Sequence, residues 1–343
     1  MNTLQKTKLR GTGINCGLIV LLFAVVLLLG QVLPQNTYRR VLVPIIWQMC
    51  IFILLGTSLN LTLGYLGQLT LGHMGFAGVG AYTAALTSLA LERAGLFEAS
   101  KAAPGQLILV ILGCCLLGAI FAGLLGLLVG IPALRLHGDY LAIVTLACGE
   151  IIKNIITNLN ITGGALGLDT SSIYAGAKDL LPYGAVLVLL TVAVMLNLKR
   201  SKYGRAIMAI RDNRIAAESV GLNVTWYKLA VFVIAAFFAG CAGVLYGHSL
   251  ANIKAAAFDY NMSIEILVIV VLGGMGSVPG SVISAIVLTV LPEALREVAD
   301  YRMLVYAIVL ILVMQATNNP TMKRFFASAK EKLTPGRKER AAL

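Results

Sequence analysis

The sequence predicts an all-α, polytopic membrane protein, a helical bundle of eight to ten transmembrane helices. Hydrophobic residues make up 59% of the 343 residues and charged residues only 12%, whereas soluble domains carry about 25% charged residues. Apolar runs recur along the chain at the length of about 20 residues that a helix needs to cross a bilayer. The basic residues gather between these runs, which is typical of membrane proteins with a defined orientation.

The first element is an apolar run, Ile14–Leu33, which follows a head of residues 1–13 that carries Lys6, Lys8 and Arg10. A signal peptide has a shorter apolar region of about 7–15 residues and a small-residue cleavage site. We therefore expect a retained first span whose N-terminal head is cytoplasmic.

The remaining spans follow in order. The chain contains apolar segments at 41–63, 67–90, 106–134, 140–158, 181–198, 229–248, 263–291 and 303–316. The segment 263–291 is long enough for one tilted helix, but Gly273–Gly280 interrupts it with four glycines and a proline. Because glycine and proline together favour a break, we predict two short helices there, which favours ten spans over eight.

Basic residues mark three segments as cytoplasmic: the head, the loop 199–228 and the tail 318–343. Cytoplasmic segments of membrane proteins carry an excess of Lys and Arg, and six spans before residue 199 satisfy this topology. We expect a single transmembrane permease domain over residues 1–343 with both termini in the cytoplasm. The pair Arg39–Arg40, which this topology places outside, goes against the rule.

A second glycine-rich stretch, Gly64–Tyr82, contains six glycines. Unwound backbone at membrane depth is tolerated only inside protein or along a water-filled cavity, and broken segments in two halves of a chain point to a transport site. The alternative is tight helix packing on small residues. We predict broken helices near 64–80 and 273–280. The predicted substrate path contains Gly67, Gln68, Gly72, His73, Gly273, Gly274 and Gly276.

Two acidic residues within apolar segments, Glu150 and Glu265, are placed beside the same path, because ionisable residues inside a membrane are expensive and commonly functional. Lys153 lies three residues after Glu150. On a helix these two side chains share one face, so an ion pair between them is the alternative to a role in solute passage.

The sequence contains no evident catalytic or metal-binding constellation, and we expect no cofactor. The six cysteines lie in apolar segments without a C-x-x-C spacing, and the three histidines are scattered, so we predict no metal site. The glycine-rich segment 160–167 lacks the Lys-Ser/Thr ending of a phosphate-binding loop. The net charge of +12 comes without basic–aromatic interleaving, which argues against nucleic acid as a partner.

The loop 199–228 predicts two short helices. Residues 206–210 and 215–220 each suffice for one or two turns, Asp212 or Asn213 can cap the second, and Gly221 can end it. A helix pair that is apolar on one side and basic on the other fits a groove on a soluble partner. The alternative is a basic loop on anionic lipid headgroups.

Residues Ile215–Gly221 resemble the "EAA" coupling loop of bacterial ABC importer permeases: Ala216, Ala217 and Gly221 match, whereas Ile215 stands where the family pattern has Glu. The context Gly204–Asn223 is similar to the branched-chain amino acid subgroup. Further motifs of that subgroup agree in order: Leu63–His73, Gly138–Thr145, Ile161–Gly164, Ser263–Leu267, Gly273–Gly280 and Tyr301–Leu304. The resemblance covers roughly residues 41–316.

The resemblance implies a membrane subunit of a branched-chain amino acid importer in the bacterial cytoplasmic (inner) membrane. It implies alternating access, a second permease subunit as heterodimer partner, two cytoplasmic ATPase subunits and an extracytoplasmic solute-binding protein. ATP hydrolysis would belong to the partners, so the chain itself is no enzyme. The residues that the resemblance assigns to ATPase coupling are Gly204, Arg205, Ala216, Ala217, Glu218 and Gly221.

Two alternatives remain at the level of sequence. One is an ABC permease for urea, short amides or sugars, because the absent binding protein sets specificity in such systems. The other is an ion-coupled secondary transporter, for which Glu150, Asp259 and Glu265 are the candidate coupling acids.

Overall fold

The computed structural model describes residues 42–95, 104–136, 138–173, 177–295, 307–308 and 311. The predicted span 14–33, most of the span 303–316, and the basic head and tail lie outside the described residues. The chain divides into two compact units, Met1–Thr289 and Val290–Leu343. The first unit holds almost all described elements, whereas the described part of the second is the end of helix α12 and three further helical residues.

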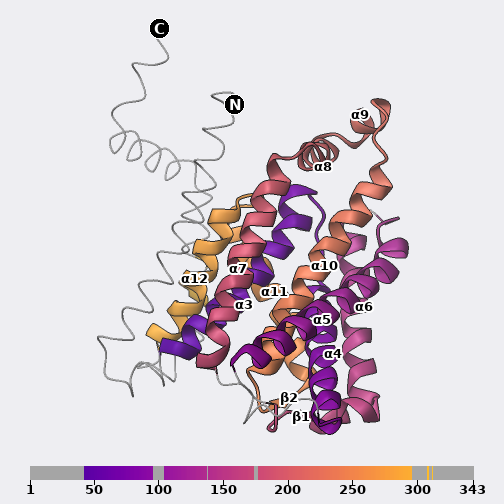
Figure 1. The fold of residues 1–343 in the computed structure, drawn as a ribbon. Coiled ribbons are helices and arrows are strands. Elements are labelled where there is room, and N and C mark those ends of the chain that lie inside the picture. The colour runs from indigo at the N-terminus through magenta and orange to yellow at the C-terminus, as the bar shows by residue number, and fades with distance from the viewer. Residues whose placement is uncertain are drawn as a thin grey trace, which may run out of the picture. The chain divides into compact units, whose positions relative to one another are not determined.

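Long helices dominate the first unit (Figure 1), which confirms the predicted all-α membrane bundle. Six helices of the described part are long and apolar enough to cross a membrane. They are α3 (Val43–Asn60, continued by a π-helical turn Leu61–Tyr65), α4 (His73–Arg93), α5 (Pro104–Ala133), α6 (Asp139–Asn158), α7 (Ala177–Arg200) and α10 (Val224–His248).

Two of these helices begin elsewhere than the apolar runs predict. α4 begins at His73 instead of residue 67, because residues 66–72 are not helical. α10 begins at Val224 instead of residue 229, because the side chain of Asn223 caps it by accepting a hydrogen bond from Trp226 N at 3.1 Å. Hydropathy alone misses such polar first turns, which belong to the helix but not to the apolar run.

Small residues bring α10 close to α4 and α5. A Cβ atom on Gly243 would overlap the carbonyl group of Ala77, and one on Gly80 would overlap the backbone of Gly240. Buried cysteines on α5 and α10, among them Cys114 and Cys241, fill the adjoining apolar cluster. Close packing on small residues is the main source of helix association in membranes, so this three-helix contact forms a rigid part of the bundle.

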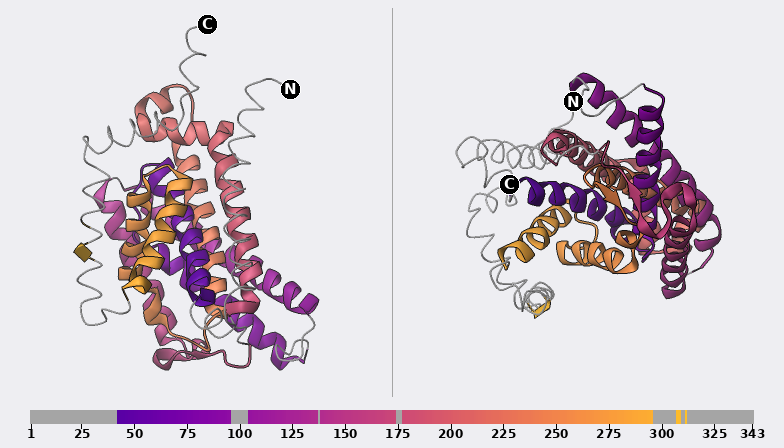
Figure 2. Two further views of the ribbon diagram at one scale, coloured as in Figure 1. Left: turned by 90° about the vertical axis from the view of Figure 1, so that its left-hand side faces the viewer. Right: turned by 90° about the horizontal axis from the view of Figure 1, so that it is seen from below.

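Helices α11 (Tyr260–Gly273) and α12 (Val278–Ala294) confirm the predicted interruption of 263–291. Figure 2 shows from two sides how these shorter helices follow one another. They meet at Gly273 and Gly280, where an added Cβ on Gly273 would lie 2.5 Å from Gly280 C. The turn 274–277 between them leaves a second stretch of non-helical backbone.

Short elements close the two ends of the bundle. The loop 199–228 forms α8 (Lys202–Asp212) and α9 (Arg214–Ser219). At the opposite end of the spans, strand β1 (Leu168–Asp169) pairs antiparallel with β2 (Asn252–Ile253), with Leu168 opposite Ile253. The predicted glycine-rich loop 160–167 lies at that same end and contains two 3-10 turns, Asn160–Thr162 and Gly164–Leu166.

Candidate functional site

The helix pair α8–α9 is set by local cap chemistry. Ser201 Oγ accepts a hydrogen bond from Gly204 N at 3.1 Å and caps α8. Asn213 Oδ1 accepts one from Ala216 N at 3.1 Å and caps α9. Such caps satisfy backbone donors that have no partner within the helix. Of the two predicted caps for α9, Asn213 is therefore the one that the fold uses.

Gly221 ends α9 in the left-handed conformation, with φ of +84°. Its N–H donates to Glu218 O at 3.0 Å, and Leu222 N donates to Ala217 O at 3.1 Å. This pair of bonds is a Schellman motif, in which glycine is strongly preferred because a Cβ is disfavoured at positive φ. The predicted helix end is confirmed.

Gly204 allows α8 to turn tightly against the end of α7, because a Cβ at this position would overlap Leu198 O. Arg205 is exposed and donates from Nη1 to Arg200 O at 3.3 Å. Ala217 is buried, whereas Ala216 and Glu218 are exposed, and Glu218 pairs with Arg214 at 2.9 Å. The predicted coupling residues thus lie close together on one helix pair.

The surface of α9 exposes two large apolar side chains. Ile215 is 80% and Val220 76% exposed. Apolar residues exposed between charged ones are typical of a surface that contacts another protein. This arrangement suits the docking surface that the sequence predicts.

The structure contains two helix breaks. The first comprises the π-helical turn Leu61–Tyr65 and the non-helical residues 66–72, and the second is the turn 274–277. The two breaks are in direct contact. Gly276 N donates to Asn60 Oδ1 at 2.8 Å, and Asn60 Nδ2 donates to Ser281 Oγ at 3.1 Å. A Cβ on Gly64 would overlap both Asn60 Oδ1 and Gly276 N. Glycine at position 64 is thus a packing requirement that lets the π-helical turn touch the turn 274–277.

Two basic side chains, one at the end of α8 and one at the end of α7, donate hydrogen bonds to backbone carbonyl groups of the two breaks. Arg211, at the end of α8, donates from Nη1 to Gly64 O at 2.9 Å. Lys199, at the end of α7, donates from Nζ to Gly276 O at 2.5 Å and lies over the ring of Tyr65 at 5.4 Å. Hydrogen bonds from charged donors are roughly twice as strong as neutral ones, so α8 is firmly attached to the first break and the end of α7 to the second.

Gly67 and Gln68 also lie at this end. Gly67 has φ of +73°, and a Cβ there would lie 2.6 Å from Arg211 Cγ. Gln68 N donates to Thr62 O at 3.0 Å, while its side-chain Oε1 is buried and has no hydrogen bond to any residue that the structure describes. An unsatisfied buried acceptor costs about 1–3 kcal/mol, so the amide of Gln68 is a costly group at the first break.

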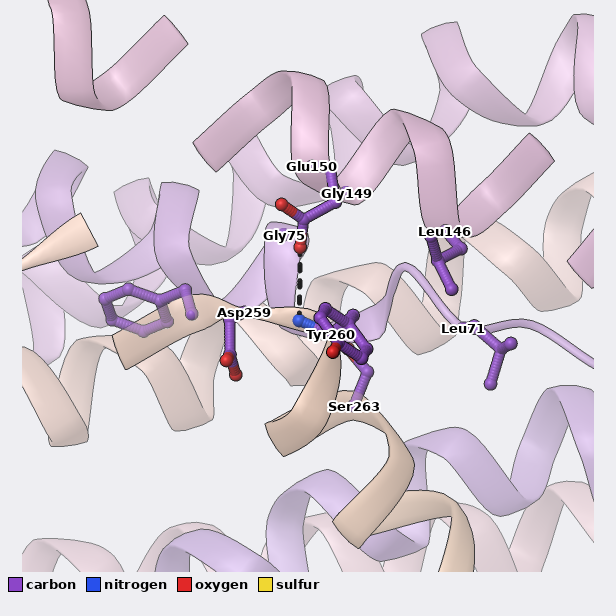
Figure 3. Close-up of a pocket in the computed structure, with 9 residues that line it drawn as sticks. Leu71, Gly75, Leu146, Gly149, Glu150, Asp259, Tyr260 and Ser263 are labelled. Atoms are coloured by element: carbon purple, nitrogen blue, oxygen red, sulfur yellow. Dashed lines mark hydrogen bonds between the residues drawn. The ribbon is translucent and has the colours of Figure 1, made fainter. Parts of the chain in front are cut away.

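A narrow pocket between three elements contains one residue of the predicted path, Glu150, while its other lining residues were not predicted as path residues (Figure 3). Leu71 and Gly75 come from the first break and α4, Gly149 and Glu150 from α6, and Asp259, Tyr260 and Ser263 from the start of α11. Glu150 Oε1 accepts a hydrogen bond from Tyr260 N at 3.2 Å, drawn as a dashed line. The pocket leaves no space for a water molecule, so it is closed here.

Glu150 also forms an ion pair with Lys153, as the alternative interpretation of that sequence motif predicts. The carboxylate of Glu150 therefore forms an ion pair within α6 and also accepts a hydrogen bond from the first residue of α11. Asp259 caps α11, its Oδ1 accepting from Met262 N at 3.1 Å. Both acids have structural hydrogen bonds, which leaves half-buried Glu265 as the candidate coupling acid without a hydrogen bond or ion pair in the described part of the chain.

The other predicted path residues lie apart from the pocket lining. His73 is 3% exposed and bonds through Nε2 to Ser58 Oγ at 2.7 Å. Gly72 is a contact with α6, since a Cβ there would overlap Thr145 O. Gly273 is the contact with Gly280, and Gly274 has φ of +86° in an open position. The predicted path is therefore divided between a packed interior, the closed pocket and the α8 contact.

Arg211, Lys199 and Asn60 belong to this site but were not among the predicted site residues. The sequence shows Arg211 and Lys199 only as part of the basic loop that sets orientation. Asn60 is a lone amide in an apolar span, and a rule that treats every intramembrane polar residue as a functional candidate would have found it.

The chain is similar to known proteins over most of its length. The family described as "Branched-chain amino acid transport system / permease component" matches residues 41–314. The high-affinity branched-chain amino acid transport system permease proteins LivM of Salmonella typhimurium and of Escherichia coli are each 35% identical over 324 residues, which covers 85% of this chain and 72% of theirs. LivH of Salmonella typhimurium is 32% identical over 132 residues, 38% of this chain and 42% of its own. No solved structure is significantly similar to the chain.

Proposed function

Since this chain belongs to the family of branched-chain amino acid transport system permease components, we propose that it is the membrane-spanning subunit of an ATP-driven importer of leucine, isoleucine and valine. It is a multi-pass membrane protein, as its six long apolar helices and its relatives agree. The observation that carries the mechanism is that α8 is bonded to the first helix break through Arg211 and the adjoining end of α7 to the second break through Lys199.

ATPase subunits bind the helix pair α8–α9 in this proposal. The exposed side chains of Ile215 and Val220 enter a groove on the ATPase, while Ala216, Ala217, Glu218 and Gly221 shape the helix that presents them. Gly204 and Arg205 hold α8 against the end of α7. The chain supplies the docking surface, and ATP hydrolysis occurs on the partners.

A movement of α8 is transmitted through Arg211 and Lys199. Arg211 of α8 bonds the first break, and Lys199 at the adjoining end of α7 bonds the second. A joint shift of α8 and the end of α7 therefore pulls on the π-helical turn before α4 and on the turn between α11 and α12. The backbone of residues 66–72 and 274–277 is not helical, so these segments can change conformation at lower cost than the packed contact of α4, α5 and α10. Packed elements then move as rigid bodies about the breaks.

The solute path passes the closed pocket of Figure 3 in this scheme. Opening it requires α11 to move away from α6, which breaks the hydrogen bond from Tyr260 N to Glu150. Polar groups in the pocket, Ser263 Oγ and the first N–H groups of α4, then become available to a solute. The first turn of a helix favours a carboxylate, a group that every amino acid carries.

The assembly comprises a second permease subunit, two ATPase subunits and a solute-binding protein outside the membrane. Resemblance to LivH as well as LivM supports a partner of similar fold. The excess of Lys and Arg in the loop 199–228 supports a cytoplasmic location for α8–α9, with both termini on that side. The strand pair β1–β2 then lies on the outer side, where the binding protein delivers its ligand.

Uptake of labelled leucine at submicromolar concentration tests the proposal. Cells that lack the chain should lose this uptake, and the intact chain should restore it. Restoration by the Gly221→Trp or Arg205→Glu variant at normal rates would contradict the coupling role. Unchanged leucine uptake in the deletion strain would refute the substrate, and urea and sugars would be tested next.

A further inference from the structure

A cavity of about 330 Å³ lies where the C-terminal end of α5 meets the N-terminal end of α10, beside the first residue of α9. Its wall has an apolar part, formed by Ile131, Leu134 and Leu229, and a cationic part, formed by Arg135, Arg214 and Lys228. Cavities of roughly 300–1,000 Å³ with apolar walls and a few polar groups are typical of ligand sites. None of these six residues belongs to the coupling residues or the solute path.

Lys228 is the unusual member of this wall. Its side chain is 7% exposed, and within the described part of the chain it has neither a hydrogen-bond acceptor nor an ion-pair partner. Glu218 acts on this charge electrostatically but is itself paired with Arg214. Lys228 lines the cavity, so its ammonium group can be reached from there. A cation with little exposure and no acceptor of its own is stabilised by an anion placed in that cavity.

The position of the cavity favours an anion that belongs to the membrane. It opens at the ends of two spans, and Ile131 in its wall is 52% exposed. The same helix exposes Leu124 and Leu128 at 55% and 70%, a surface suited to acyl chains. Trp226, on the first turn of α10, is 55% exposed, and tryptophan is enriched at the level of lipid headgroups.

We propose that this cavity binds the phosphate group of an anionic phospholipid from the leaflet on the side of α8–α9. Lys228 and Arg135 donate charge-assisted hydrogen bonds to the phosphate oxygens, Arg214 adds positive charge, and the acyl chains lie along the exposed leucines of α5. The lipid would join α5, α9 and α10 at one point. This inference depends on the membrane location of the chain and not on its substrate.

The test is binding of phosphatidylglycerol to the delipidated full-length chain in detergent, followed by native mass spectrometry, with phosphatidylethanolamine of the same acyl chains as reference. Lys228→Met and Arg135→Gln should each weaken phosphatidylglycerol binding about fivefold or more, since each cation near an anionic lipid contributes at least that factor. The matched control is Lys202→Met, which removes an equal charge from α8 outside the cavity and should leave binding unchanged.

Equal binding by the wild type and both cavity variants would overturn the proposal, as would an equal loss in Lys202→Met. Binding of millimolar inorganic phosphate that requires Lys228, together with phosphatidylglycerol binding that does not, would identify free phosphate as the ligand and refute the lipid. Arg135 is exposed, so its replacement should not disturb folding. If Lys228→Met does not fold, the binding of phosphatidylglycerol to Arg135→Gln therefore tests the proposal.

Discussion

At the scale of single residues, the site depends on hydrogen bonds between side chains and the backbone of distant turns. Asn60, Lys199 and Arg211 each bind a backbone group of a break: Gly276 N, Gly276 O and Gly64 O, respectively. A break inside a membrane protein leaves polar backbone groups that need partners. These three side chains supply them, and Arg211 connects the first break to α8 while Lys199 connects the second break to the end of α7.

Arg211→Met is expected to reduce leucine uptake about tenfold or more, because a hydrogen bond from a charged donor contributes about 1.5–3 kcal/mol. Binding to the ATPases should persist, since Ile215 and Val220 are untouched. Lys202→Met, which removes the same charge from the exposed face of α8, is the control. Uptake by Arg211→Met at the control rate would show that the bond to Gly64 O does not transmit motion.

Gly64→Ala should destabilise the protein and reduce uptake, because its Cβ would overlap Asn60 Oδ1 and Gly276 N. Gly113→Ala is the matched control: a Cβ on Gly113 meets nothing within 4 Å, and alanine in a helix is favoured over glycine by about 0.5–1 kcal/mol. Thermal unfolding of the two purified variants compares them. A Gly64→Ala midpoint at or above that of Gly113→Ala would contradict the close approach of the two breaks.

At the scale of elements, α9 combines precise ends with an apolar exposed surface. Asn213 and Gly221 define its six residues, so the directions of Ile215 and Val220 are fixed despite the short length. A six-residue helix has little stability of its own. Its caps and the buried Ala217 therefore have an essential part in presenting the docking surface.

Ile215→Asp with Val220→Asp is expected to abolish binding of the ATPase subunits, measured by co-purification, because carboxylates would be placed where apolar contact forms. Ile161→Asp is the control, since Ile161 is 72% exposed at the other end of the bundle. ATPase recovery equal to wild type in the double variant would exclude α9 as the docking helix.

At the scale of the whole molecule, the long helices separate two ends with different tasks. One end holds α8, α9 and the contacts of the breaks, and the other holds the strand pair β1–β2 and the loop 160–167. The closed pocket lies between these ends, where α4, α6 and α11 meet. Motion at one end must therefore pass through the breaks to alter the pocket.

The proposed orientation predicts opposite labelling of the two ends. In a cysteine-free background, Ser219→Cys should react with an impermeant maleimide only from the cytoplasmic side, and Ile161→Cys only from outside. Intact cells and inside-out vesicles give the two measurements. Labelling of both positions from the same side would overturn the topology.

Sequence patterns predict the membrane class, most spans, the interruption at 273–280, the end of α9 at Gly221 and two candidate N-caps for α9, Asp212 and Asn213. Each depends on a local signal: hydropathy over about 20 residues, glycine with proline, or an Asn and a Gly at the ends of a short helix. The spans at 14–33 and 303–316, and with them the total count of spans, stay predictions.

The role of each glycine in packing or in a turn became known from the folded chain alone. Gly64 and Gly276 meet although they lie in opposite halves of the chain, His73 is satisfied by Ser58, and Gly67 lies against Arg211 instead of in the pocket. Glycine has no side chain, so its neighbours cannot be read from residue type. The partners of Arg211 and Lys199 are backbone carbonyls, which every residue carries, and only the folded chain selects which carbonyls they bind.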